Sequence, residues 1–339
     1  MEVIKYSDVL RRVVSYAQRV YSELNADDAE AISVYLDTRL KKIWETYPWP
    51  DLVRVEKRYY RPLYAAATTY AAGDEVYYPS EEKYYQALKS TQGNVPTLTT
   101  HWAEAKQSYS PATWVTGTAY SVGDTVEYDP DGLYYACHTA HTAGATLGSN
   151  WGQIIEFDKY VAWKQSGKNE IADVMDMWNA NPRTDNKADQ QNFYQSENGV
   201  QVINGPNIVY IEYRQLVPSL LYSAWVVGGV YKTGDVVRYP ASGADFDLYK
   251  ASADSTGNAS SGSENYPGEH YVSPWSIIQI PRDFRSYLAH GAAADILLAD
   301  EREQLGGVQN SLGEKALNEL LGKLERQEKQ TKQMNVVNR

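Results

Sequence analysis

Phenylalanine is scarce in this chain, whose 339 residues include 4 Phe but 29 Tyr and 9 Trp. Phe suits dry cores, whereas Tyr and Trp join an apolar ring to a polar group and suit half-hydrated surfaces and interfaces. The imbalance predicts several small, shallow cores or several contact surfaces. The length suggests two or three domains.

Cysteine and long apolar runs are also lacking. Cys137 is the single cysteine, which excludes an internal disulfide. No stretch approaches the roughly 18 uninterrupted apolar residues of a membrane span, and the first residues, MEVIKYSDVL, have no apolar core of signal-peptide length. We therefore expect a soluble protein, made in a reducing compartment, that does not engage a membrane.

A basic surplus is absent, since 32 Lys and Arg face 43 Asp and Glu. This excludes a general nucleic-acid binder, whose footprint would be basic. Residues 1–63 hold 11 basic and 10 acidic side chains, and residues 281–339 hold 9 of each. Residues 64–280 hold 12 basic and 24 acidic ones. The ends resemble each other and the middle differs, which indicates an interrupted architecture.

The N-terminal end predicts two helices. Apolar residues recur at helical spacing over 7–24, where Ser7 can cap the start. Asn25 is a plausible cap for a second helix, which Pro48 and Pro50 stop. Residues 52–59 alternate like a strand.

The C-terminal end mirrors this pattern. Pro281 can occupy the first turn of a helix that reaches Leu298, and Gly306-Gly307 breaks it. A further helix begins near 309 and fades into the polar tail 326–339, whose composition suggests ordering on binding.

An internal repeat lies between the ends. An aromatic residue, then Tyr six positions on, Gly-Asp, and a Val and Tyr two positions apart recur from Tyr64, Trp114 and Trp225. Each copy continues with Tyr-x-Ala and closes with Trp: Tyr85-Gln-Ala87 and Trp102, Tyr134-Tyr-Ala136 and Trp151, Tyr249-Lys-Ala251 and Trp275. Gly-Asp makes a turn before a strand, and units this small need large aromatics for a core. We predict three small all-β modules: repeat 1 (64–107), repeat 2 (111–157) and repeat 3 (223–280).

Residues 158–220 separate the second repeat from the third. This segment alternates around Val209, Ile211 and Tyr213, with a turn at Asn198-Gly199. It predicts a small sheet that belongs with the two ends of the chain.

Motifs that could carry chemistry are weak. Cys137-His138-Thr-Ala-His141 lacks the second ligand pair of a structural zinc site, and Asp129-Pro-Asp131-Gly132 favours a turn over a calcium loop. No pair of carboxylates stands out for acid–base work, and the chain has no phosphate loop or nucleophile elbow. We expect no enzyme, no metal and no cofactor.

Five tryptophans occupy recurring places in the repeats and have two interpretations. They can anchor small cores, which is the favoured interpretation, or form tentative contacts with glycans or other surfaces. They are Trp102, Trp114, Trp151, Trp225 and Trp275.

The repeats resemble the small chitin-binding-type carbohydrate-binding module of bacterial chitinases. The resemblance rests on the aromatic-x5-Tyr-x2-Gly-Asp-x-Val-x-Tyr frame, Tyr-x-Ala and the closing Trp, and covers roughly 64–105, 114–155 and 225–279. In that family, exposed neighbouring aromatics stack on sugar rings. The loops before the closing Trp here have no adjacent Trp pair.

The remaining segments resemble tailed-phage head–tail connector (adaptor) proteins. The segments concerned are KKIWETYPWPDL with LVRVEKRY, DVMDMWNANPR with NIVYIEYRQLVP, and PRDFRSYLAHGAAADILLADE. The resemblance implies an adaptor scaffold of 1–63, 158–220 and 281–339. The expected fold class is α+β, with a helical bundle from both chain ends plus a small β-sheet and three small all-β modules inserted.

This resemblance implies a structural virion protein at the head–tail junction, or neck, assembled in the host cytoplasm. Copies would form a ring, expected to be a dodecamer, that binds the portal protein and the next neck or tail protein. DNA would pass through its channel during genome ejection without specific binding. The alternative is a carbohydrate-binding adhesin or tail-associated protein that uses its β-modules to bind glycans. A third reading, a non-catalytic fragment of a chitin-degrading system, is disfavoured because the sequence shows no catalytic domain or signal peptide.

Overall fold

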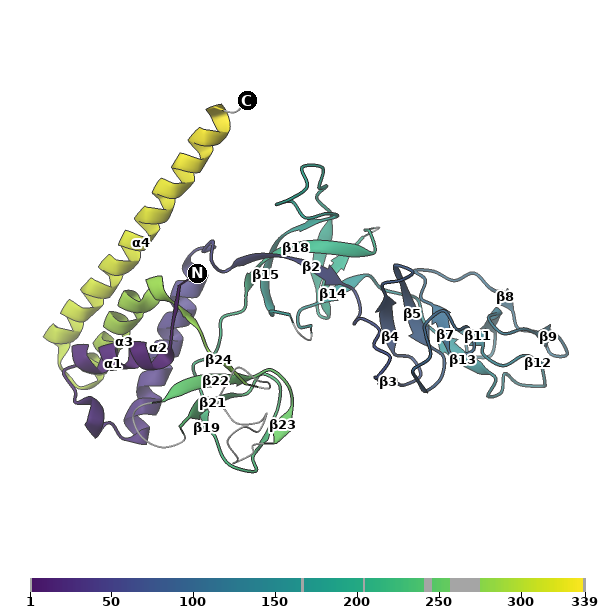
Figure 1. Ribbon diagram of the computed structural model, residues 1–339, viewed down its shortest axis with the longest axis horizontal. Helices are drawn as coiled ribbons and strands as arrows, with labels where there is room; N and C mark the ends of the chain where they lie inside the picture. The colour runs from purple at the N-terminus through teal and green to yellow at the C-terminus, as the bar shows by residue number, and fades with distance from the viewer. Residues whose placement is uncertain (1, 166–167, 204, 241–245, 257–274, 338–339) are drawn as a thin grey trace. The chain divides into compact units, whose positions relative to one another are not determined.

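The computed structural model describes residues 2–165, 168–203, 205–240, 246–256 and 275–337 (Figure 1). Contacts divide the chain into two compact units: unit 1 combines Met1–Leu52 with Val217–Arg339, and unit 2 is Val53–Leu216. The predicted scaffold of 1–63, 158–220 and 281–339 is therefore distributed over both units. Helices and strands are both well represented, so the predicted α+β class is confirmed.

The helices of unit 1 come from both ends of the chain. They are α1 (Tyr6–Tyr16), η1 (Tyr21–Glu23), α2 (Ala26–Thr46), η2 (Arg282–Phe284), α3 (Arg285–Ala299) and α4 (Glu303–Val337). Helix α3 contacts α1, α2 and α4. One apolar core joins them, with Leu10 of α1, Leu36 of α2 and Leu288 of α3 fully buried. Asn25 caps α2 as predicted, by accepting a hydrogen bond from the Asp28 amide at 2.8 Å.

Helix α1 is shorter than the predicted 7–24 and is capped differently. It ends at Tyr16 because Gln18 adopts a left-handed conformation with φ 57°. Ser7 lies inside the helix, and its amide donates to Asp247 Oδ1 at 3.0 Å. The predicted local cap is thus replaced by a carboxylate 240 residues away, which also lies 3.7 Å from Lys5 Nζ.

The predicted break at Gly306-Gly307 is wrong, because α4 runs through both glycines. A Cβ on Gly306 would lie 2.9 Å from Leu298 Cγ, and one on Gly313 would lie 3.4 Å from the Gly291 nitrogen. These glycines allow α3 and α4 to approach closely. The helices separate earlier, at Glu301, where φ is 60°.

Repeat 3 belongs to unit 1. Its strands are β19 (Ser223–Ala224), β20 (Val230–Tyr231), β21 (Val236–Tyr239), β22 (Asp247–Ala251), β23 (Ser255–Thr256) and β24 (Trp275–Ile277). They form a sheet of order β19-β21-β22-β24 and a pair β20-β23, and β1 (Val3–Ile4) pairs with β25 (Ile280–Pro281). Phe246, Leu248 and Ile278 are buried in the same core as the helices.

Outside repeats 1 and 2, the described residues of unit 2 form two three-stranded antiparallel sheets. One has the order β15-β18-β2, from Ile171–Trp178, Ile208–Gln215 and Val53–Tyr59, and the other the order β14-β17-β16, from Tyr160–Ala162, Gly199–Val202 and Phe193–Ser196. The strand predicted over 52–59 is confirmed, and it pairs with 208–214. Val161, Val200 and Ile211 are fully buried in one shared core.

Repeats 1 and 2 complete unit 2. Repeat 1 has β3 (Thr69–Tyr70), β4 (Glu75–Tyr78), β5 (Lys83–Ala87), β6 (Thr91–Gln92) and β7 (Trp102–Glu104). Repeat 2 has β8 (Ala112–Thr113), β9 (Ala119–Tyr120), β10 (Thr125–Tyr128), β11 (Leu133–Cys137), β12 (His141–Thr142) and β13 (Trp151–Ile154). The strand order of repeat 2, β13-β11-β10-β8, matches that of repeat 3.

Candidate functional site

The repeated aromatic frame has the same geometry in all three copies. The hydroxyl oxygen of its central tyrosine accepts a hydrogen bond from the amide five residues earlier, at 2.8, 2.8 and 2.6 Å for Tyr70, Tyr120 and Tyr231. The same ring meets the closing tryptophan edge-on, with centroids 5.3, 5.0 and 5.1 Å apart. The tyrosine hydroxyl is therefore used to hold the chain, and the ring to fill the core.

The Gly-Asp pair explains how the frame is held. The glycines have φ of 93°, 95° and 102°, a region that other residues rarely adopt. The following aspartates accept a hydrogen bond from the amide three residues earlier, at 2.7, 2.8 and 2.7 Å; they are Asp74, Asp124 and Asp235. Both residues thus build the turn before β4, β10 and β21.

The structure encloses most of the candidate contact tryptophans. Trp102, Trp151, Trp225 and Trp275 are buried, with exposed fractions from 1% to 8%. Trp114 is half-buried and meets Tyr128 edge-on at 5.4 Å. Stacking on a sugar needs an exposed ring face, so these four buried rings act inside their repeats.

Strand pairing corrects the frame predicted for repeat 2. The valine of the repeated frame pairs with Tyr85 in repeat 1, with Tyr135 in repeat 2 and with Tyr249 in repeat 3. The predicted Tyr134-Tyr-Ala136 is therefore wrong by one residue, and Tyr135-Ala-Cys137 is the equivalent segment. Cys137 occupies the place of Ala87 and Ala251, a buried site for a small side chain.

The neighbourhood of Cys137 is a packing cluster. Its Sγ lies 3.8 Å from His141 Nδ1, and Trp151 Nε1 lies 3.1 Å from His141 Nε2, the distance of a hydrogen bond donated by the indole. Asp131 caps the β10–β11 turn by accepting from the Leu133 amide at 2.9 Å. Within the described ranges, no three His, Cys, Asp or Glu side chains are grouped so that they could hold a metal ion.

Cys137 is expected to be unreactive until repeat 2 opens. Burial raises the pKa of the Cys137 thiol, so the thiolate is disfavoured in the folded state. The raised pKa stabilises the folded state at pH values below the ordinary thiol pKa. This stabilisation is lost as the pH rises from the ordinary pKa through the raised one. Alkylation by iodoacetamide at pH 8 should be slower by more than about tenfold in buffer than in denaturant.

Two variants check the origin of that protection. Cys137→Ala should lower the free energy of unfolding by less than about 1.5 kcal/mol, because alanine stands at both equivalent positions. Cys137→Leu should cost about 1–3 kcal/mol through overpacking. Rapid native alkylation, or equal losses in both variants, would contradict a tightly packed thiol.

The opposite face of each repeat carries different residues, which the sequence analysis missed. Tyr77 and Tyr84 of repeat 1 are buried in the core of the two sheets of unit 2. Leu248 of repeat 3 is buried among the helices of unit 1. Repeat 2 packs Ala136 against Leu88 of repeat 1. The alternation of side chains along each strand could have predicted this second face, because these residues point to the side opposite the repeated aromatic frame.

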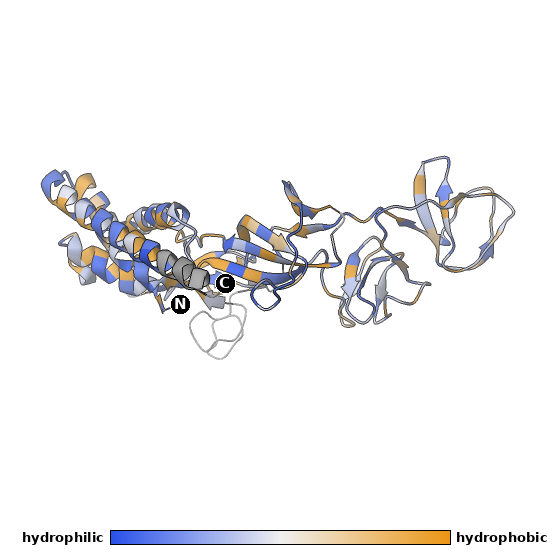
Figure 2. Ribbon diagram, turned by 90° about the horizontal axis from the view of Figure 1, so that it is seen from above, coloured by the Kyte–Doolittle hydropathy of each residue, from blue (hydrophilic) through white to orange (hydrophobic). Residues whose placement is uncertain are grey.

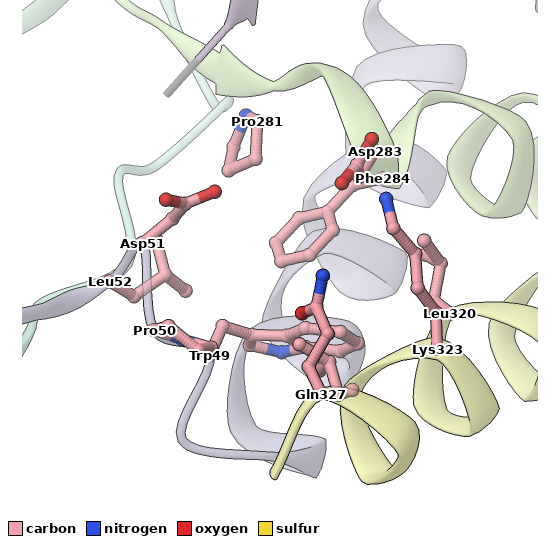
Figure 3. Close-up of a pocket in the computed structure, with 11 residues that line it drawn as sticks. Trp49, Pro50, Asp51, Leu52, Pro281, Asp283, Phe284, Leu320, Lys323 and Gln327 are labelled. Carbon is pink, nitrogen blue, oxygen red and sulfur yellow. The ribbon is translucent and has the colours of Figure 1, made fainter. Parts of the chain in front are cut away.

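A hollow of about 270 Å³ lies in unit 1 where α2 ends (Figure 3). Its walls include the rings of Trp49 and Phe284, whose centroids are 5.0 Å apart, and Leu320 of α4. Figure 3 shows Asp51 and Lys323 on opposite sides of it. The hollow is apolar at its base and charged at its rim, which suits an apolar side chain from a partner.

A second hollow, of about 280 Å³, lies in unit 2 between repeats 1 and 2. Tyr85 and Trp102 line it from repeat 1, together with Glu104 and Lys106, and Ile154 lines it from repeat 2. Aromatic edges beside charged and hydroxyl groups could accept a polar ligand.

The chain was compared with protein-family models, curated proteins and solved structures, and nothing matched. No helix among the described residues combines the length and the hydropathy needed to cross a bilayer.

Proposed function

We propose that this protein is a non-catalytic structural component of a virion, the adaptor ring in the neck of a tailed phage. It would join the portal protein to the next neck or tail component and form part of the DNA channel. In this proposal the helices of unit 1 are the ring-forming bundle, and the three repeats are modules inserted into an adaptor scaffold.

One observation carries the proposal. Helices from residues 6–46 and 285–337 share a single core, while residues 53–216, which lie between them in the sequence, form a second compact unit. This agrees with the arrangement that the resemblance to connector proteins implies, in which helices from both chain ends come together. The acidic middle of the chain also suits a surface that DNA passes without binding.

Mass photometry and negative-stain imaging, with and without the portal protein, test the proposal. The expected result is a ring with an open centre, near twelve times the chain mass of 38.2 kDa, or ring formation when portal is added. Portal imaged alone is the control. A protein that stays monomeric under both conditions would refute the adaptor function.

Glycan binding is the second candidate, and the hollow between repeats 1 and 2 is the observation that favours it. Tyr85 and Trp102 border that hollow beside the charged side chains of Glu104 and Lys106. A monomer retained on chitin, and released by Lys106→Ala at the exposed border of the hollow, would support an adhesin. No retention by any polysaccharide tested would leave the hollow without this role.

A further inference from the structure

Helix α4 has apolar residues on two sides. One side packs on α3 through Gly306, Gly313 and Leu317, which are buried. The other side carries Leu305, Val308 and Leu312, which are 38–57% exposed. Their spacing of three and four residues places them in one stripe, centred about 130° around the helix from the packed face at about 100° per residue. Figure 2 shows hydrophobic and hydrophilic residues alternating along the helices of this unit.

Helix α2 has an apolar patch of its own. The Ser33 hydroxyl donates to the Leu220 carbonyl, and the Leu220 amide donates to Asp37 Oδ1 at 2.8 Å. These bonds hold Leu220, and with it the neighbouring Leu221, along the part of α2 that includes Val34. Both side chains are nearly half exposed. We call Val34 and Leu221 the α2 patch, and Leu305, Val308 and Leu312 the α4 stripe.

The patch and the stripe cannot meet within one chain. Arg39 marks the side of α2 that faces the other helices, because its guanidinium lies 2.6 Å from Asp295 of α3 and 3.2 Å from Asn310 of α4. Val34 is five residues earlier, which places it about 140° around the helix. The α2 patch therefore points away from the chain's own α4.

The charges beside the two surfaces are complementary. The α4 stripe continues along its face into exposed Lys315, Glu319 and Arg326, a basic surplus. The α2 patch continues towards the helix start into exposed Glu30 and Asp27, one and two turns from Val34. In the other direction, Lys41 lies 2.7 Å from its own Asp37 and adds little free positive charge.

We propose that the α2 patch of one copy docks on the α4 stripe of a second copy, so that copies associate head to tail. Two different apolar surfaces of opposite charge, on different sides of one unit, are what a heterologous contact requires. Repeating such a contact closes a ring when the rotation between copies permits it. The docking of patch on stripe would be the contact between subunits of the proposed adaptor ring. Its closure into a ring rests on the proposed function.

Two double variants test the contact by mixing. Val308→Asp with Leu312→Asp removes the stripe and keeps the patch, whereas Val34→Asp with Leu221→Asp removes the patch and keeps the stripe. Each alone should be monomeric in analytical ultracentrifugation. Their equimolar mixture should form one-to-one heterodimers that grow no further, because each pair retains a single intact contact. Circular dichroism should show unchanged helix content in both.

A matched control uses exposed valines elsewhere in the same unit. Val226→Asp with Val230→Asp, at two exposed positions of repeat 3, should leave assembly at wild-type mass. If the two helix variants keep wild-type rings, or if their mixture contains no heterodimer, the docking proposal is overturned while the adaptor function stands. If heterodimers form but the wild type makes no ring with portal, the contact is supported and the adaptor function falls.

Discussion

Trp102→Ala is expected to lower the free energy of unfolding of unit 2 by about 3–5 kcal/mol. The ring is almost fully buried, lies edge-on to Tyr64 and Tyr70 at 6.1 and 5.3 Å, and donates from Nε1 to the Asn94 carbonyl at 3.0 Å. Alanine removes these contacts and leaves a cavity that so small a repeat cannot refill. Urea denaturation followed by tyrosine fluorescence measures the loss.

The effect should extend beyond repeat 1, because Tyr77 and Tyr84 on its other face help to fill the core of the neighbouring sheets. Hydrogen exchange should therefore quicken in β18 as well. The matched control is Trp151→Ala, which removes the equivalent ring from repeat 2, none of whose strand residues is part of that core. Trp102→Phe should recover part of the loss. Unchanged exchange in β18 after Trp102→Ala would contradict a shared core.

Leu248→Ala should destabilise the helices of unit 1 by about 2–5 kcal/mol, although the residue belongs to a β-repeat. Its side chain is fully buried in the core that α1, α2 and α3 share. Phe246, two positions earlier, stacks on Tyr6 of α1 with ring centroids 5.5 Å apart. Loss of this packing should appear as an earlier loss of the far-ultraviolet helical signal in denaturant.

Tyr134→Ala is the matched control, because Tyr134 occupies the equivalent strand position in repeat 2. That side chain is half-buried and packs near Tyr109 at 5.8 Å. The expected loss is about 1 kcal/mol, as for most partly exposed sites, and the helical signal should not change. Equal helix destabilisation by both substitutions would show that repeat 3 is not part of the helical core.

The repeats were predictable from sequence because their rules are local. A glycine with positive φ, an aspartate that closes a turn and aromatics at fixed spacing specify each frame without help from elsewhere. The residues that fix each repeat in place were not predictable in the same way. Tyr84, Tyr134 and Leu248 share one strand position, and only the surroundings decide which becomes deeply buried.

Two of the errors share a physical cause, which is that distant contacts overrode local patterns. Gly306 is a weak helix former by propensity, yet close packing against α3 requires a residue without a side chain at this position. The apolar spacing after Tyr16 suggested a continuing helix, but Arg19 is held 2.9 Å from both Asp28 and Asp300. In repeat 2 a run of two tyrosines hid the frame, which strand pairing then located at Tyr135.

The shared core of unit 1 has a consequence for synthesis. Unit 2 can complete its contacts once residue 216 has left the ribosome, but α1 and α2 must wait for α3, some 240 residues later. At about 5–20 residues per second, that delay is on the order of ten seconds or more. Through this interval Leu10, Leu36 and Leu40 lack their native cover, and until Asp247 is made Ser7 also lacks the carboxylate that caps its helix. Nascent chains stalled between residues 216 and 284 are therefore the ones that should need chaperones most.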